Sequence, residues 1–264
     1  MTVNKFSLNG FHVIRGGISK SLLQSAQNDV MHILNDKSKV NYTSFQKILL
    51  RSKKNNQFEF IKKINGYLIY RKVIDKLLKE KKIHNYISSI LGSDLCYENN
   101  PNTLILNIPE RASSKKNYMF KDWHQEVWSG AGTNTLQVWI PIFQKDNSGG
   151  QIELIKNSHK WGHVPHRNRR PIEMPKSYKT IKTNIKLGDV LVFSTTIMHR
   201  SLPTKFSRLT LPTLVRNFKY KNYSFENNKS WTVYSNSEVT KIERYLGNHY
   251  LSPFRTADIK VKFE

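Results

Sequence analysis

Short apolar runs separated by turn residues fill the chain from about residue 95 onward, and they restrict its fold more than any other feature. These runs are residues 104–108, 135–142, 151–155, 180–186, 190–194 and 209–218. Each has the length of a β-strand, and Gly, Pro, Asn and Asp stand between them. Several short strands bounded by turns predict a sandwich or barrel, and the double-sheet jelly roll is the natural candidate.

Two segments before residue 95 have the spacing of amphipathic helices. Apolar residues recur at helical intervals in residues 19–35 and again in residues 69–91, with a possible break near 79–82. Gly92 then stands where a helix would end. The polar residues 37–66 between them give no clear assignment. The chain is therefore expected to be mainly β with flanking helices.

The 264 residues contain no internal repeat and no segment with the composition of a linker. This length suits one sizeable core. We predict a single domain over residues 1–264, with a helical flank at about 19–92 and a jelly-roll core at about 95–219. Residues 220–264 are too aromatic for a disordered tail and are predicted to pack on that core.

The chain carries a formal net charge of +24 at pH 7. Such a charge would usually indicate nucleic acid or an anionic surface as the partner. Here the lysines are scattered along the whole chain beside many Asn and Ile, and the densest basic groups are not interleaved with aromatic residues. The composition therefore favours a solvated surface over a nucleic-acid footprint.

No stretch of the sequence approaches the ~18 consecutive apolar residues of a membrane span. Residues 1–9 lack the charged, apolar and small-residue regions of a secretory signal. The single Cys96 excludes an internal disulfide and suits a reducing compartment. These features predict a cytoplasmic protein with no membrane partner.

His124 and Glu126, separated by one residue, are followed at a distance by His199. On an extended strand, residues two apart project from the same face of the sheet. Two imidazoles and one carboxylate are the protein ligands of a non-heme Fe(II) site that leaves coordination positions open. The three residues therefore predict a catalytic metal centre.

The residues around this triplet follow a family pattern. Its elements are Gly10 to Gly16, Asp122-Trp123, Ser148-Gly149-Gly150, Asn157 to Gly162, Leu187-Gly188-Asp189 and His199 to Pro203. In order and spacing the chain resembles the phytanoyl-CoA dioxygenase-like family of Fe(II)/2-oxoglutarate oxygenases, over residues 8–218 and most specifically 122–208. The resemblance implies a cupin-like double-stranded β-helix, with Fe(II) as cofactor and 2-oxoglutarate as cosubstrate.

The resemblance also implies a cosubstrate site. Arg208 would hold the distal carboxylate of 2-oxoglutarate in a bidentate fork, and Ser201 would donate its hydroxyl to the same group. Gln137 and Trp139 would line the cavity from one face of their strand, and a plain core role for Trp139 is about as expected. The anchoring arginine often falls two residues later in the family, where this chain has Thr210.

Three more features of the pattern bear on the site. Arg216 is the rival anchor, about 26 Å from Arg208 along an extended strand. Most relatives carry Asp where this chain has Glu126, and the retained carboxylate favours hydroxylation over halogenation. Asn107 and Thr135 are weaker candidates for the cavity lining, and Trp128 is a candidate to face the substrate.

The resemblance implies an enzyme, a dioxygenase that hydroxylates an unactivated C–H bond of a small molecule and releases succinate and CO2. A non-catalytic ligand-binding jelly roll and an oxygenase acting on nucleic acid are the alternatives. An anionic substrate is a further expectation, with Lys160, Arg167 or Arg169 as its contacts. His159, His163 and His166 suggest a zinc cluster, but structural zinc sites normally add Cys ligands or a second spaced pair.

Overall fold

The computed structural model describes residues 2–33, 41–51, 64, 66, 72–98, 104–107, 109, 122–145, 151–168, 170–220 and 231–241. Predictions that concern residues 37–40, 52–63, 110–121, 146–150, Arg169, 221–230 and 242–264 lie outside this part of the chain. They include the Gly-rich turn at 148–150 and most of the aromatic C-terminal segment.

A large antiparallel sheet forms the centre of the molecule. Its strands follow the order β1-β9-β4-β11-β2-β12, and β3 pairs with β11 beside this path. Their bounds are β1 Phe11–Ile14, β2 Leu95–Glu98, β3 Ile105–Asn107, β4 Thr135–Phe143, β9 Val190–Ser194, β11 Arg208–Asn217 and β12 Trp231–Val233. The two longest strands, β4 and β11, lie side by side and form the longest ladder of the sheet.

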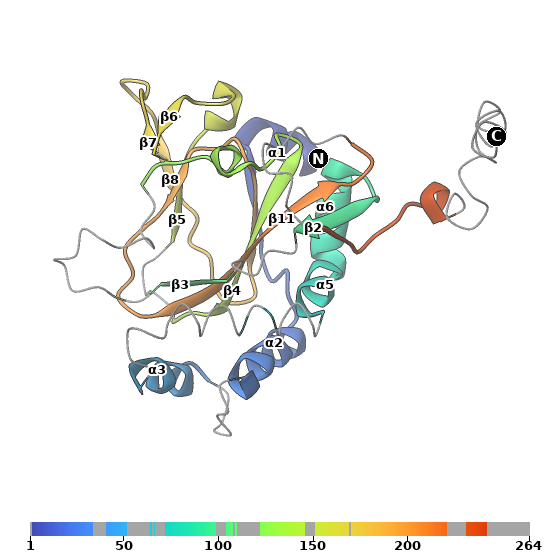
Figure 1. The fold of residues 1–264 in the computed structure, drawn as a ribbon, viewed down its shortest axis with the longest axis vertical. Helices are drawn as coiled ribbons and strands as arrows, with labels where there is room; N and C mark the ends of the chain where they lie inside the picture. The colour runs from blue at the N-terminus through green and yellow to red at the C-terminus, as the bar shows by residue number, and fades with distance from the viewer. Residues whose placement is uncertain are drawn as a thin grey trace, which may run out of the picture.

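A smaller sheet has the order β10-β5-β8, with β5 Ile152–Ile155, β8 Thr180–Lys182 and β10 His199–Ser201. The strands β6 His166–Arg167 and β7 Arg170–Pro171 form a separate hairpin. Figure 1 shows β5 and β8 on one side of β4 and β11, and helices α5 and α6 on the other. The layers are thus a small sheet, a large sheet and helices.

The described helices are α1 Thr2–Asn9, α2 Lys20–Ile33, α3 Tyr42–Arg51, α5 Val73–Leu78 and α6 Lys81–Leu91. Their apolar residues join one face of the large sheet in the main core, where Leu77, Ile83 and Ile87 meet Val138 and Ile140. The break expected near residue 80 separates α5 from α6, and Gly92 ends α6 with φ 81°. None of these helices is long and apolar enough to cross a bilayer.

The alternation along β4 divides the two faces of the large sheet. Leu136, Val138 and Ile140 belong to the helix-side core. Trp139 belongs instead to a second core between the two sheets, with Ile152 and Leu154 of β5 and Leu191 and Phe193 of β9. We call the side of the large sheet that faces the small sheet its inner face. Because side chains alternate along a strand, Gln137 shares the inner face with Trp139.

The jelly-roll prediction is confirmed, and the sheets of this chain are antiparallel throughout the described ladders. Residues 190–194 form β9 with the bounds expected. Residues 180–186 form a shorter strand than expected, because β8 ends at Lys182 and the side chain of Gln151 then bonds the Ile185 backbone. The helices α1 and α3 and the strands β2, β10 and β12 were not predicted, since each is short or lacks a clear period.

Candidate functional site

His124 and His199 are paired by an isolated antiparallel β-bridge. This bridge is not part of a longer ladder between two strands. The His124 N–H donates to the His199 carbonyl and the His199 N–H donates to the His124 carbonyl, each over 3.0 Å. The two ring centroids lie 4.1 Å apart. The backbone alone therefore holds the two imidazoles side by side, although they are distant in sequence.

Glu126 reaches the same place from a different local structure than the expected strand. Gln125 is extended (φ −116°, ψ 146°), so Glu126 does share a side of the chain with His124. The chain then turns into the 3₁₀ helix η2, Glu126–Ser129, which begins at Glu126 itself. The prediction that both residues lie on one strand is wrong, because η2 begins only two residues after the bridge residue His124.

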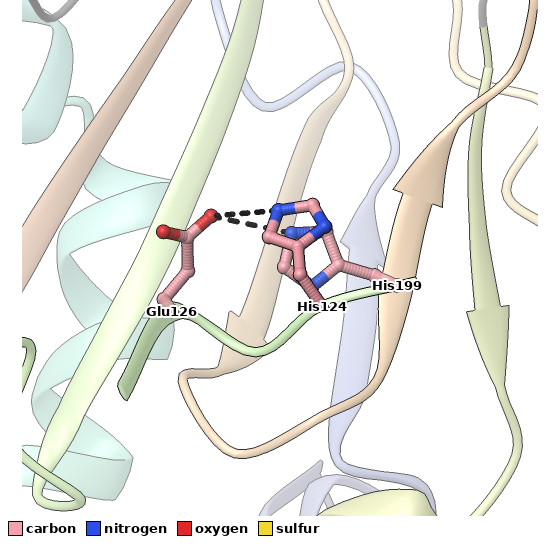
Figure 2. Close-up of side chains that lie close together, drawn as sticks. All are labelled: His124, Glu126 and His199. Atoms are coloured by element: carbon pink, nitrogen blue, oxygen red, sulfur yellow. Dashed lines mark ion pairs between the residues drawn. The ribbon is translucent and has the colours of Figure 1, made fainter. Parts of the chain in front are cut away.

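The three side chains converge. Glu126 Oε1 lies 3.2 Å from His199 Nε2 and 3.7 Å from His124 Nε2, as Figure 2 shows. One ligand atom from each residue lies within 4.8 Å of the others, and both imidazoles are buried. Neighbouring ligands of a metal bound at about 2.1 Å lie ~3 Å apart in octahedral geometry. The cluster is therefore close to the size that one metal ion requires.

The tautomers of the two histidines fit metal binding. His124 Nδ1 lies 2.8 Å from the Asp122 carbonyl, and His199 Nδ1 lies 3.1 Å from the Ile197 carbonyl. A carbonyl can only accept, so each Nδ1 is a donor, and Nε2 is the atom that a neutral ring would offer to a metal as a lone pair. Two lone pairs and a carboxylate repel one another unless a cation lies between them. Such backbone partners are also typical of the residues that orient metal-ligating histidines.

Gln125, between the two proposed ligands, is a residue whose role the sequence did not reveal. Its side chain is fully buried and donates to the carbonyls of Gly162 and Thr196. Its Oε1 accepts the Val164 N–H over 2.9 Å. These bonds tie the loop that carries His124 and Glu126 to two neighbouring loops, and the only sequence signal was its place on the face opposite its two neighbours.

Arg208 is the largest fully buried side chain of the described residues, at 1% exposure. Its guanidinium lies over the Trp139 ring, 4.8 Å from the centroid. Within the described structure its Nε and Nη1 have no hydrogen-bond partner, and burial lowers the pKa of the guanidinium to about 9. A buried guanidinium without a carboxylate is costly, so the site is suited to an anion supplied by a ligand.

The other predicted cosubstrate residues share the space between the sheets. Gln137 is opposite Phe193 of β9, and the Phe193 ring packs edge-on against His199 with centroids 4.7 Å apart. Ser201 follows His199 on β10 by two residues and so shares its face of the small sheet. Trp139 belongs to the inter-sheet core, as one of its two expected roles requires, and its ring also contacts the Arg208 guanidinium.

Asn107 lies directly opposite Arg208 in the β3–β11 ladder. It is fully buried, and neither atom of its amide has a partner among the described residues. Thr135, the first residue of β4, also has a buried hydroxyl without a hydrogen-bond partner among the described residues. Unsatisfied buried polar atoms are rare in folded proteins, and these lie on the same inner face.

The segment after β5 does not join this centre. Trp123, Val164 and Met198 form a small core with Ile155, whose side chain lies on the face of β5 opposite Leu154. Trp128 stacks on His166 and donates to the Val164 carbonyl, so it faces this segment. The segment therefore covers the outer face of the small sheet, where Lys160 and Arg167 are exposed.

The three histidines that suggested a zinc cluster do not meet. The His159 Nε2 donates to the Ser7 carbonyl, while the His163 and His166 rings lie 6.4 Å apart. Among the residues that the structure describes, only His124, Glu126 and His199 form a group of the size and composition that holds a metal.

A jelly roll with two imidazoles and one carboxylate gathered between its sheets is the arrangement of the non-heme Fe(II) oxygenases. The family model described as Phytanoyl-CoA dioxygenase (PhyH) matches residues 6–210 of this chain. The chain therefore belongs to the phytanoyl-CoA dioxygenase family of Fe(II)/2-oxoglutarate-dependent enzymes. No curated protein matches it.

Solved structures share the fold. The apo form of the non-heme monooxygenase ThoJ has a TM-score of 0.61 and 16% identity, covering 90% of this chain and 85% of that chain. The non-heme alpha ketoglutarate dependent epimerase SnoN from nogalamycin biosynthesis has a TM-score of 0.55 and 11% identity, covering 82% and 79%. At these identities the likeness concerns the architecture alone.

Proposed function

We propose that the protein is an Fe(II)- and 2-oxoglutarate-dependent dioxygenase that hydroxylates an unactivated C–H bond of a small-molecule substrate. The observation that carries this proposal is the convergence of His124 Nε2, His199 Nε2 and Glu126 Oε1 within 4.8 Å of one another. Membership of the phytanoyl-CoA dioxygenase family supports it.

His124, Glu126 and His199 would hold the iron, and their backbone contacts fix the two rings before the metal arrives. Such preorganisation is what a metal site needs from the residues around its ligands. When bound, Fe(II) and 2-oxoglutarate supply the oxidising chemistry with O2, in which the cosubstrate becomes succinate and CO2 and the substrate gains a hydroxyl group.

Arg208 would bind the distal carboxylate of 2-oxoglutarate, with Ser201 as a further donor. Two guanidinium nitrogens that have no partner among the described residues support this assignment, because a charge-assisted fork is the strongest recognition of a carboxylate that a side chain offers. Trp139 holds the guanidinium by its ring. Gln137 lies two residues from Trp139 on the same face and would touch the cosubstrate between anchor and metal.

Apolar side chains between the two sheets would exclude water from the proposed site. Leu191, Phe193 and Ile197 are almost fully buried in the inter-sheet core, and Phe193 and Ile197 contact His199. In a dry, low-dielectric cavity the charged contacts of Arg208 are stronger than they would be in water. The same apolar residues would keep the oxidant away from solvent and from other side chains.

The proposal is tested with purified protein, Fe(II), ascorbate and 2-oxoglutarate labelled at C1. Labelled CO2 and succinate are expected in equal amounts, slowly even without substrate. His199→Ala should abolish this release, whereas His163→Ala, an exposed histidine outside the cluster, should leave it unchanged. Release by His199→Ala at the wild-type rate would refute the assignment, and tight ligand binding by an iron-free wild type would favour a binding module.

A further inference from the structure

Arg216, near the end of β11, lies on the inner face of the large sheet. Its neighbour Val215 packs in the helix-side core, so alternation turns Arg216 toward the other face. It is directly opposite Thr135 of β4 and Cys96 of β2. Leu95 and Tyr97 pack in the helix-side core, which confirms the same face for Cys96.

The two inner-face arginines of β11 stand near opposite ends of that strand. Leu214 is opposite Gln137, which is opposite Phe193, the residue whose ring contacts His199. Arg216 is the next inner-face position beyond Leu214, about 7 Å along the strand. Arg208 lies at the other end of β11 and leans on Trp139. Arg216 therefore shares the inner face with Leu214 and Gln137 and lies at the far end of β11 from the proposed cosubstrate anchor.

The guanidinium of Arg216 is stacked on an aromatic ring. It lies over the Trp231 ring of β12, 4.2 Å from the centroid. Its Nε is buried and has no hydrogen-bond partner within the described residues, and the hydroxyl of Thr135 opposite is in the same condition. Stacking on an indole leaves the N–H edge of a guanidinium available to an anion.

We propose that Arg216 and Thr135 bind the anionic head group of the substrate, and that the substrate is a small acid with a carboxylate or phosphate. This inference rests on the proposed oxygenase function. It gives the two arginines of β11 different tasks: Arg208 takes the cosubstrate and Arg216 takes the substrate. It also replaces the expected contacts Lys160 and Arg167, which lie on the outer side of the small sheet.

The test measures binding to the full-length protein loaded with Fe(II) and 2-oxoglutarate under anaerobic conditions. Hexanoate, octanoate and decanoate are titrated beside their own amides, which have the same shape without the charge, and octyl phosphate separates phosphate from carboxylate recognition. At least one acid should bind more tightly than its neutral partner. Arg216→Gln should lower the affinity for that acid by about tenfold or more, as expected when a hydrogen bond to a charged group is lost.

Two variants make the result specific. Arg170→Gln removes the same charge from the exposed β6–β7 hairpin and should keep the full preference for the acid. Arg216→Lys keeps the charge but loses the fork, and an intermediate affinity is expected. Equal binding of acid and neutral partner by the wild type, or a preference that survives in Arg216→Gln, would overturn the inference. Loss of 2-oxoglutarate binding in Arg216→Gln would overturn it too, whereas a wild type that binds no 2-oxoglutarate refutes the proposed function itself.

Discussion

His124 and His199 exchange both backbone hydrogen bonds, at 3.0 Å each, and thereby form a bridge between the loop before η2 and the first residue of β10. The two imidazoles owe their positions to the main chain and to the carbonyls that accept from their Nδ1 atoms. Glu126 follows Gln125, whose side chain ties this loop to residues 162, 164 and 196. The proposed metal site therefore depends on both the bridge and the Gln125 side chain.

Gln125→Ala should destabilise the protein and weaken metal binding together. The variant leaves the carbonyls of Gly162 and Thr196 and the N–H of Val164 without their partner. The expected cost is on the order of 3 kcal/mol in the free energy of unfolding, measured by urea denaturation. Gln24→Ala, which removes a bond to Asn28 on an exposed helix surface, should cost less than about 0.5 kcal/mol. Equal effects of the two variants would contradict the role given to Gln125.

Glu126→Asp should bind iron more weakly, although Asp is usual at this position in the resembled family. Glu126 extends from the start of η2 to bring Oε1 within 3.2 Å of His199 Nε2. One methylene fewer withdraws the carboxylate by about 1.5 Å, beyond the ~0.5 Å that a metal site tolerates. We expect Fe(II) affinity to fall about tenfold or more, measured by competition with a chelator. Tighter Fe(II) binding by Glu126→Asp than by the wild type would contradict this, because it would show that the longer side chain is not needed to reach the metal.

The affinity for 2-oxoglutarate should depend on pH through Arg208. Burial lowers the pKa of its guanidinium to about 9, and a carboxylate binds the charged form. Below pH 9 the group is already protonated and the affinity should be constant. Above pH 9 binding must take up a proton, so the dissociation constant should rise about tenfold per pH unit. Anaerobic titrations one unit to either side of 9 measure this slope.

Two results would speak against that prediction. Arg208→Gln has no proton to lose and should bind 2-oxoglutarate weakly, without the slope. A wild-type affinity that stays constant above pH 9, or an Arg208→Gln variant with unchanged affinity, would place the cosubstrate carboxylate elsewhere.

The sequence predicted those elements whose pattern is long enough to read. The alternation of Leu136, Val138 and Ile140 with Gln137 and Trp139 identified β4, and the period of residues 19–35 identified α2. β2 and β12 span only four and three residues and have no alternation that separates them from loops. Their partners on β11 exist only in the folded sheet.

The site was predicted through its chemistry, and what was missed depends on long-range contacts. Two imidazoles and a carboxylate indicate metal binding whatever their local structure, so the change from strand to 3₁₀ helix at Glu126 did not affect the prediction. The sequence could not show that Gln125 bonds to residues near 162 and 196, nor that the segment around Arg167 covers the outer side of the small sheet. The place of Arg216 opposite Thr135 on the inner face follows only from the register of β11 with β4.

The most direct test of the central claim is an anaerobic titration of the metal-free protein with Fe(II). The wild type should bind one equivalent tightly, and His199→Ala should lose that tight binding while its far-ultraviolet circular dichroism remains that of the wild type. Because the His124–His199 bridge uses backbone atoms alone, the substitution removes a ligand without removing the bridge. One tight equivalent in both proteins would contradict the account, since the three side chains would then not be holding the ion.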